Sequence, residues 1–483
     1  MKKRCLFTIS AILLVSILTS LLCCFPVSAA SVTEISTADQ LKAVKDNLAG
    51  SYRLTADIDL GGEEWEPLGD EATPFTGTFD GNGKTVSNFT VTADEDYGKN
   101  HAGFFGTVST GTIKDLKIAT ATITTSYSIY AGAIAGHLSS HEGGLVSGCV
   151  TASDVTVIAN GNFANWIAIG GIVGRSFGTV QYCENNATVK NESCHRLPTD
   201  EDPTTTQLAF TGGICGGAVG TVKYCINNGN VITEDYEGKK GAWLCSTGGI
   251  IGQTNPWMHE GNGLRCLVDS CINNGTVSNK FENLNLSSCA GGIVGVTYGG
   301  NSDINARTIK NCFNFGAIDC MNAGQILGHK GTGIEGQLGA FTSDNNYGIA
   351  NLAPMCYNVE NSLLTVVGTP ETAANMKANT TYLAILAAVE ENMIFELSEM
   401  PAPAVAPETP PSDTTTDNTD DDGEDEEEEE VKKKSDKTTD TSADTTAETE
   451  AEEEGGCKSS ISLAGVALVT ALGIGVTACK KKN

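Results

Sequence analysis

A short glycine-bracketed phrase recurs seven times along the middle of this chain, with two apolar residues before its closing glycine. The copies are AGFFG (102–106), GAIAG (132–136), GGIVG (170–174), GGICG (212–216), GGIIG (248–252), GGIVG (291–295) and GQILG (324–328). The closing glycines lie 30 to 43 residues apart. Repetition at a period of tens of residues is typical of a solenoid and not of a globule that folds once.

A second phrase follows the first in most copies. It reads GTVQYCENNATV (178–189), GTVKYCINNGNV (220–231), LVDSCINNGTV (267–277) and TIKNCFNFGAI (308–318), with a looser copy GLVSGCVTASDV (144–155). Alternating apolar residues over so short a run indicate a strand, and Asn-Gly indicates a turn. A repeat of two or three short strands cannot bury its own apolar side, so successive repeats must stack. We therefore predict an all-β fold, a right-handed parallel β-helix with small helical end caps.

Stacking in register places equivalent residues of successive repeats above one another. The five cysteines of the second phrase would form one column, which we interpret as small buried apolar side chains and not as metal ligands or disulfides: Cys149, Cys183, Cys225, Cys271 and Cys312. Asn185, Asn227 and Asn273 would form a second column, hydrogen-bonded from side chain to side chain.

The remaining cysteines of the repeat region do not follow this spacing. Because an exported protein resides where disulfides can form, we consider them candidates for bridging: Cys194, Cys245, Cys266, Cys289 and Cys320.

The first thirty residues have the parts of a secretory signal. Lys2, Lys3 and Arg4 precede the apolar run 6–25, and small residues at 27–30 offer a cleavage site. The sequence therefore predicts export, with residues 1–30 removed.

The other end of the chain predicts a stalk and an anchor. Residues 401–456 contain 21 acidic residues and four lysines with almost no large apolar side chain, so we expect a disordered, extended linker. Within 457–483, residues 461–479 carry no charge and are followed by three lysines, which predicts a transmembrane helix with a cytoplasmic tail. The remainder of the protein would lie at the cell surface.

Between signal and linker we expect three parts. Residues 31–74 would form an N-terminal cap, with a helix that begins at the Ser36–Asp39 motif and ends near Asn47, followed by a strand at 52–60. Residues 75–358 would form the β-helix, including strands at 75–79 and 85–91 around a DGNG turn at 80–83. Helices at 370–377 and 381–391, within 359–400, would cap the last coil.

The net charge of −29 argues against a nucleic-acid partner, which requires a basic face. We also expect no resident cofactor or metal, because the six histidines show no HExxH spacing and no CxxC pair is present. The histidines are His101, His137, His141, His195, His259 and His329.

The segments PFTGTFDGNGKTVSNFTV (74–91) and GFFGTVSTGTIKDLKI (103–118), with the repeated GGIVG units, resemble the GLUG-motif proteins of bacterial surfaces. That resemblance covers roughly residues 35–360 and implies a fold similar to the pectate-lyase-like right-handed β-helices. The tail from 455 to 483 resembles the terminal anchors of surface proteins from clostridia and their relatives, without an LPxTG-like pentapeptide. The resemblance implies a Gram-positive surface protein and supplies no catalytic residues.

Two main functions fit these features. The first is an adhesin-like binding module for extracellular glycans or for host or environmental proteins, with exposed tryptophans such as Trp166, Trp243 and Trp257 as candidate contacts. Loops at 191–207 and 254–265 would be places for a ligand to dock. A purely structural surface protein is a further alternative.

The second function is a polysaccharide lyase or hydrolase, which needs two carboxylates close together in a cleft. The candidates are the acidic cluster around Trp65 and the turn aspartate, namely Asp57, Asp59, Glu63, Glu64, Glu66 and Asp80. We interpret Asp80 as a turn former and the cluster as a solvated loop. The sequence therefore predicts a non-enzymatic protein and assigns no catalytic residue.

Overall fold

The computed structural model describes most of the chain between residues 31 and 405. The described residues are 31–93, 101–126, 130–140, 143–160, 166–192, 208–234, 244–254, 265–280, 289–298, 307–331, 341–350, 352–357 and 367–405.

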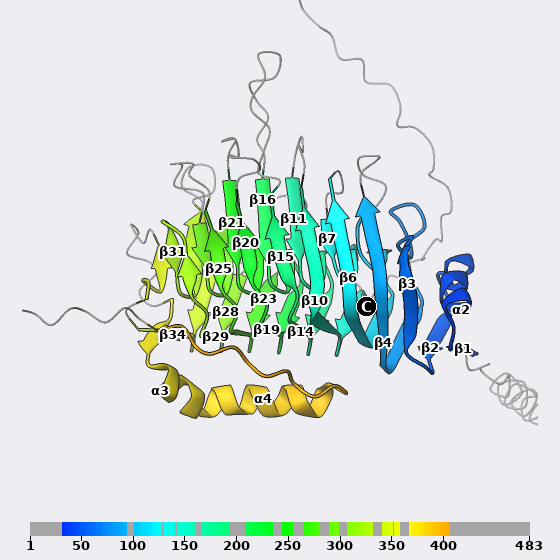
Figure 1. Cartoon of the computed structure of the whole chain (residues 1–483). Coiled ribbons are helices and arrows are strands. Elements are labelled where there is room, and N and C mark those ends of the chain that lie inside the picture. The colour runs from blue at the N-terminus through cyan, green and yellow to red at the C-terminus, as the bar shows by residue number, and fades with distance from the viewer. Residues whose placement is uncertain are drawn as a thin grey trace, which may run out of the picture. The chain divides into compact units, whose positions relative to one another are not determined.

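Parallel strands stack coil upon coil in three sheets, which makes the described region a parallel β-helix (Figure 1). Sheet C contains β7 (Tyr130–Gly132), β11 (Trp166–Gly170), β16 (Leu208–Gly212), β21 (Leu244–Gly248), β26 (Cys289–Gly291) and β31 (Ala323–Gly324). Sheet B contains β5 (Phe105–Val108), β8 (Ala135–Leu138), β12 (Val173–Ser176), β17 (Cys215–Ala218), β22 (Ile251–Thr254), β27 (Val294–Tyr298), β32 (Leu327–Gly331) and β35 (Cys356–Tyr357). The glycine phrase is the turn between a sheet C strand and the following sheet B strand.

Sheet A is the largest sheet and holds the second phrase. Its early strands are β1 (Val32–Ile35), β2 (Ser51–Leu54), β3 (Ile58–Glu64), β4 (Thr78–Ala93), β6 (Thr112–Thr125), β9 (Leu145–Ser147) and β10 (Val150–Ala159). Each later coil contributes short strands: β13 (Thr179–Gln181), β14 (Glu184–Asn185), β15 (Thr188–Asn191), β18 (Thr221–Lys223), β19 (Ile226–Asn227), β20 (Val231–Thr233), β23 (Cys266–Asp269), β24 (Ile272–Asn273), β25 (Val277–Asn279), β28 (Arg307–Lys310), β29 (Phe313–Asn314), β30 (Ile318–Asp319), β33 (Phe341–Asp344), β34 (Tyr347–Ile349) and β36 (Thr369–Glu371).

The register between coils follows the repeat. Gln181 lies opposite Lys223, Lys223 opposite Asp269, and Asp269 opposite Lys310. Glycines 170, 212 and 248 are likewise paired in sheet C. Equivalent residues 36 to 46 positions apart in the sequence are therefore neighbours in space, which confirms the stacking predicted from the sequence. The right hand of the coil stays a prediction.

The predicted asparagine column is present and fully buried. Asn185 Nδ2 donates to Asn227 Oδ1, and Asn227 Nδ2 donates to Asn273 Oδ1, both at 2.8 Å. The column continues through Asn314 to Gln325 Oε1. Each amide thus satisfies the next, which removes the cost of burying polar groups inside the coil.

The cysteine column is also present, and its five thiols are free and fully buried. These cysteines lie at corners between two strands and not within a strand as we expected. Tyr182 and Tyr224, each directly before a column cysteine, have φ of 51° and 53°, and this left-handed conformation turns the chain. The prediction of bridges was wrong for four of these cysteines, which form no disulfide among the described residues: Cys245, Cys266 and Cys289 are buried in strands, and Cys320 is partly buried. Cys194 lies outside the described residues.

The N-terminal helix is present, although it is short. Helix α2 (Ala38–Lys42) begins at Thr37, whose side chain accepts a hydrogen bond from Gln40 N, and continues as the 3₁₀ helix η1 (Ala43–Asp46). Leu41 and Val44 are buried against the first coil. Strands β1 to β3 already belong to sheet A, so the stack begins within the residues 31–74 that we assigned to the cap. The predicted strand at 52–60 is split into β2 and β3.

The DGNG segment at 80–83 does not end a strand. Strand β4 runs through it with a shift of register after Asp80, and Asn82 and Gly83 have positive φ. The two predicted strands around it are therefore one bent strand.

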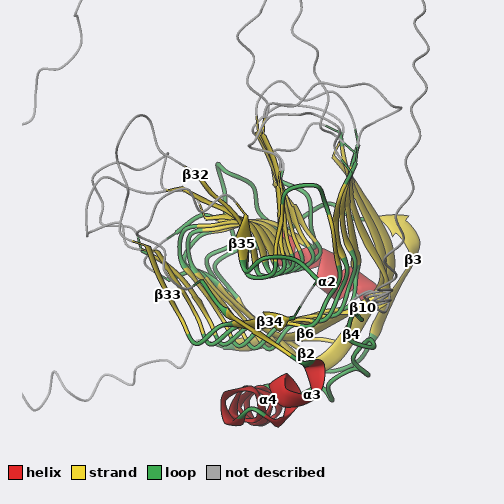
Figure 2. Cartoon of the chain, turned by 90° about the vertical axis from the view of Figure 1, so that its left-hand side faces the viewer, coloured by secondary structure: helices red, strands yellow, loops and turns green. Residues whose placement is uncertain are grey.

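The C-terminal helices lie along the side of the solenoid, so the expectation that they cap the last coil was wrong. Helix α3 (Ala373–Ala378) leads into α4 (Thr380–Asn392), which runs beneath sheet A across several coils (Figures 1 and 2). Tyr382, Ile385 and Val389 pack with outward-facing side chains of sheet A such as Ile226, Ile272 and Phe313. The apolar outer face of sheet A requires this cover.

After α4 the chain returns along the same face. Ser398 N donates to Glu184 Oε1 at 3.1 Å, and Ala404 N donates to Phe315 O at 2.8 Å. The predicted signal, the anchor and all but five residues of the predicted linker lie outside the described residues. Among the residues that the structure describes, no helix is both long and apolar enough to cross a membrane.

Candidate functional site

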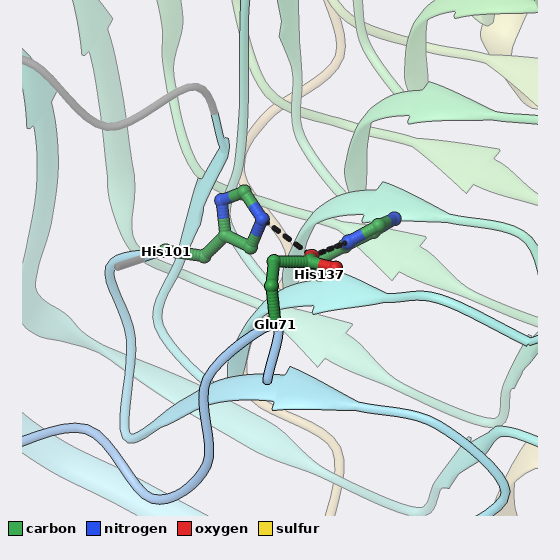
Figure 3. A group of neighbouring side chains, drawn as sticks. All are labelled: Glu71, His101 and His137. Atoms are coloured by element: carbon green, nitrogen blue, oxygen red, sulfur yellow. Dashed lines mark hydrogen bonds and ion pairs between the residues drawn. The ribbon is translucent and has the colours of Figure 1, made fainter. Parts of the chain in front are cut away.

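Two histidines and a glutamate from three separated parts of the sequence meet near the N-terminal end of the stack (Figure 3). Glu71 Oε1 lies 2.7 Å from His101 Nε2 and 2.6 Å from His137 Nδ1. The three ligand-type atoms all lie within 4.8 Å of one another. We call these residues the Glu–His–His cluster.

Glu71 is presented by a tight loop between β3 and β4. Asp70 Oδ1 accepts hydrogen bonds from Ala72 N and Thr73 N, which closes the turn. The loop is fixed to β5 at both ends, because Gly106 N donates to Leu68 O and Phe75 N donates to Thr107 O. Glu71 therefore projects toward the histidines from a defined position while its side chain stays 40% exposed.

The two histidines are placed by the coil register. His101 immediately precedes Ala102, which pairs with Ala131, so its ring lies against Tyr130, tilted by 30° and 4.7 Å away between centroids. His137 immediately follows the second glycine phrase, in register with Thr107 and Arg175 of the neighbouring coils. The two imidazole rings lie 5.0 Å apart between their centroids.

The cluster is surrounded by an aromatic and cationic group. Arg175 Nη1 donates to the Tyr130 hydroxyl, and the guanidinium lies 5.2 Å from the Tyr130 ring centre and 4.5 Å from that of Phe177. This packing holds Tyr130 against both imidazoles. The histidines are consequently 3% and 8% exposed.

The surroundings of the cluster lower the pKa values of both Glu71 and His137. Hydrogen bonds from His101 and from His137 hold the pKa of the Glu71 carboxyl far below its usual value, against a partial burial that raises it. Burial lowers the pKa of His137 to about 4, although its hydrogen bond to Glu71 raises it. At neutral pH the cluster therefore pairs a carboxylate with a neutral His137 imidazole.

A cleft of about 460 Å³ adjoins the cluster, and His101 forms part of its wall. Its other lining residues come from the N-terminal cap, the Glu71 loop and the end of β4: Lys45, Asp46, Leu48, Glu66, Pro67, Gly69, Asp70, Thr73, Val91, Thr92 and Ala93. Most of these present polar groups. A volume of this size suits a small ligand or a few sugar rings.

The acidic residues singled out from the sequence do not converge in a cleft. Glu63 pairs with Lys42 at 2.5 Å, Glu66 with Lys45 at 3.0 Å, and Glu64 accepts from Thr90 Oγ1 at 2.6 Å. Asp59 and Asp57 accept hydrogen bonds from Asn88 Nδ2 and Thr85 N of the neighbouring strand. Only Glu66 also lines the cleft.

Asp80 and Trp65 have structural roles. Asp80 Oδ1 accepts from Asn82 N, as its interpretation as a turn former predicts, and Oδ2 pairs with Arg53 at 3.1 Å and Lys114 at 3.0 Å. Trp65 is buried, stacks on Phe104, and donates from Nε1 to Phe104 O at 2.9 Å.

Several other candidates cannot be placed at a site. His141, His195, His259, Trp243 and Trp257 lie outside the described residues, as do nearly all of the loops at 191–207 and 254–265. Trp166 begins β11 and His329 lies in β32, and only their backbone is described.

Sequence reasoning missed the Glu–His–His cluster. His101 directly precedes the first glycine phrase and His137 directly follows the second, so the two residues stand at different offsets and the repeat alone does not predict that they meet. No sequence signal points to Glu71 either, because it belongs to a loop outside the repeat.

Comparison with known proteins shows partial likenesses. No family model matches the chain. Halomucin from Haloquadratum walsbyi is 33% identical over 157 residues, which is 29% of this chain and 2% of that protein. A protein of Evansella cellulosilytica named "Putative Gly-rich membrane protein" is 33% identical over 93 residues, 17% of this chain and 10% of its own length. The chain thus spans a small fraction of either relative.

Among solved structures, one described as a "putative immunoglobulin A1 protease" from Bacteroides ovatus matches with a TM-score of 0.42 and 20% sequence identity. The match covers 74% of this chain and 88% of that one. At this level of similarity it adds nothing to the assignment of the fold, which rests on the strand pairings described above.

Proposed function

We propose that this chain is a surface-displayed β-helix protein of a Gram-positive bacterium of the GLUG-motif type, and that it binds an extracellular glycan through its N-terminal cleft. The observation that carries the proposal is the polar lining of that cleft, where Lys45, Asp46 and Thr92 offer hydrogen-bond donors and acceptors together. Hydroxyl-rich ligands are recognised by such groups. Apolar partners are favoured less.

Display at the surface is supported by the sequence and by the names of the relatives. The basic, apolar and small-residue order of 1–30 fits export, and the uncharged run 461–479 before three lysines fits retention in the membrane. One relative carries the name of a membrane protein. The acidic stretch between 401 and 456 would then hold the coil away from the bilayer.

A glycan array with the purified protein tests binding. We expect retention of one glycan class, and loss of it in Lys45→Glu, which reverses a charge in the cleft wall. Lys280→Glu is the matched control, because the two lysine side chains are similarly exposed, at 57% and 60%, and Lys280 lies far along the stack from the cleft. If the protein bound host proteins and no glycan, its ligand would be a protein, and the glycan proposal would be wrong. The absence of any ligand would leave a purely structural role.

A polysaccharide-active enzyme is the second candidate, because one specific observation favours it. Asp46, Glu66 and Asp70 line one cleft, and a pair of carboxylates in a cleft is what glycosidic hydrolysis needs. Against it, Glu66 is paired with Lys45 and Asp70 closes its own turn. Release of reducing ends from a glycan that the protein binds, abolished in Glu66→Gln, would establish this activity.

A further inference from the structure

The Glu–His–His cluster offers three metal-ligand atoms at one point. In a tetrahedral site with bonds of about 2.0–2.1 Å, ligand atoms lie about 3.3 Å apart. Here the carboxylate oxygen lies 2.6 and 2.7 Å from the two nitrogens, between them. A small withdrawal of Glu71, whose side chain is 40% exposed on a loop, would open the space for an ion.

The two histidines are held for this role by their packing. Each ring contacts Tyr130, with centroid separations of 4.7 and 4.8 Å, and both histidines are buried, so neither ring can turn away without displacing Tyr130. A ligand pair fixed before the ion arrives loses little freedom on binding it. The cluster thus combines a rigid nitrogen pair with one adjustable oxygen.

The hydrogen bonding of the rings also leaves them able to ligate. His101 Nδ1 and His137 Nε2 are buried without a hydrogen-bond partner among the residues that the structure describes. With the proton of each neutral ring on that far nitrogen, His101 Nε2 and His137 Nδ1 would present lone pairs toward Glu71. Ligating histidines usually donate this second N–H to a partner, so its lack of one here lowers the affinity that we expect for an ion.

We propose that Glu71 Oε1, His101 Nε2 and His137 Nδ1 bind a divalent cation of the zinc class, with a further coordination position open toward the cleft. Two imidazoles and one carboxylate suit Zn²⁺ and disfavour Ca²⁺ and Mg²⁺, which take oxygen ligands. Glu71 brings one negative charge and Arg175 stands close by, so the affinity should be moderate. The ion would tie the Glu71 loop to two coils of the stack.

This site does not depend on the proposed glycan binding. If the cleft does take a glycan, the open coordination position would lie beside it, because His101 is a wall of that cleft. Loss of metal binding and loss of glycan binding can be scored separately on the same protein.

The test uses the full-length protein, stripped of metal by a chelator and titrated with Zn²⁺ by calorimetry, in the presence of millimolar Ca²⁺ and Mg²⁺. We expect a binding phase that Glu71→Gln weakens by roughly 100-fold or more. Glu66→Gln is the matched control, since it removes a carboxylate that lines the adjoining cleft, is 78% exposed and is not part of the cluster. Equal titrations of the wild type and Glu71→Gln would overturn the proposal.

X-ray absorption at the zinc edge identifies the ligands of the loaded protein. We expect imidazole and carboxylate scattering at about 2.0–2.1 Å without sulfur. Sulfur scattering, or an unchanged spectrum in a folded His101→Asn variant, would assign the ion to other residues and overturn the proposal. Circular dichroism of each variant separates a lost ligand from a lost fold.

Discussion

Gly213 packs directly against the side-chain amide of Asn227: a β-carbon at residue 213 would lie 2.3 Å from Asn227 Cγ and 2.2 Å from Gly249 O. The same relation joins Gly171 to Asn185 and Gly249 to Asn273. The glycine phrase and the asparagine phrase, far apart in each repeat, are therefore two halves of one contact. The glycine leaves the space that the buried amide column fills.

This contact predicts the effect of a single methyl group. Gly213→Ala should lower the free energy of unfolding by about 3 kcal/mol or more, because neither the backbone nor the amide column can move aside cheaply. The control is Gly217→Ala in the next strand, where the nearest atoms would be 3.8 Å from the new methyl group. Urea unfolding should separate the two variants clearly. Equal stability would refute the proposed packing.

The amide column predicts a cost for breaking one link. Asn227→Ala leaves the side-chain oxygen Oδ1 of Asn273 without its donor, in a fully buried position. The free energy of unfolding should therefore fall by about 2–4 kcal/mol. Asn228 belongs to an outer, partly exposed ladder, where it donates to Asn186 Oδ1 at 3.0 Å. Asn228→Ala should cost less than about 1 kcal/mol. The reverse order would be incompatible with an interior column.

The packing of α4 along sheet A predicts different stability losses for two variants of this helix. Ile385→Ala removes a side chain that is 2% exposed and packed on the outer face of the sheet, so it should cost about 2–4 kcal/mol. Leu383, two residues earlier, is 51% exposed, and Leu383→Ala should change stability by less than about 1 kcal/mol. Thermal unfolding followed by circular dichroism measures both. Equal effects of the two variants would contradict the packing of α4 on sheet A.

The ion pairs of Asp80 predict a dependence on pH. Burial raises the pKa of Asp80, but hydrogen bonds from Lys114 and Arg53 outweigh it and lower the pKa below its usual value. The stabilisation is therefore complete above the unfolded value of about 3.9 and is lost as the pH falls through the folded pKa. Asp80→Asn should cost about 1 kcal/mol at pH 7 and less at pH 3. The control is Asp319→Asn, at a side chain that is 68% exposed, which should change stability at pH 7 by less than about 0.5 kcal/mol.

The buried cysteines should react slowly with alkylating reagents. Burial raises the pKa of Cys266 to about 12 and that of Cys215 and Cys289 well above the usual value, so these thiols stay protonated and shielded. Iodoacetamide labelling of the native protein, read cysteine by cysteine by mass spectrometry, should modify Cys320 before any of them. Early labelling of Cys215, or recovery of these cysteines as disulfides, would show that the interior is not as described.

The sequence was informative wherever the repeat itself carried the structure. Three signals led to elements that are present: the alternation in the second phrase, the equal offsets of the asparagines, and the Ser36–Asp39 motif at the start of the first helix. Each of these signals is local or repeats at a recognisable offset, so spacing alone locates it.

Features that depend on contacts between unlike segments could not be predicted. Helix α4 crosses several coils because sheet A has an apolar outer face, and nothing in the helix sequence states which surface it will cover. The bridging prediction failed since Cys245 and Cys289 look like loop residues until the strands of sheet C are known. Glu71 meets its histidines only through a loop docked on β5.

The stacking of coils is the central claim, and distances between spin labels test it most directly. Ser147, Gln181, Lys310 and Asp344 belong to one column, in which Gln181 lies one coil, Lys310 four coils and Asp344 five coils beyond Ser147. With about 4.8 Å per coil, labels on Ser147 and Lys310 should lie about 19 Å apart, labels on Ser147 and Asp344 about 24 Å, and labels on Gln181 and Lys310 about 14 Å. Narrow distance distributions that rise in these even steps are the predicted result. Broad distributions, or distances that do not increase with the number of coils between the labels, would contradict the structure.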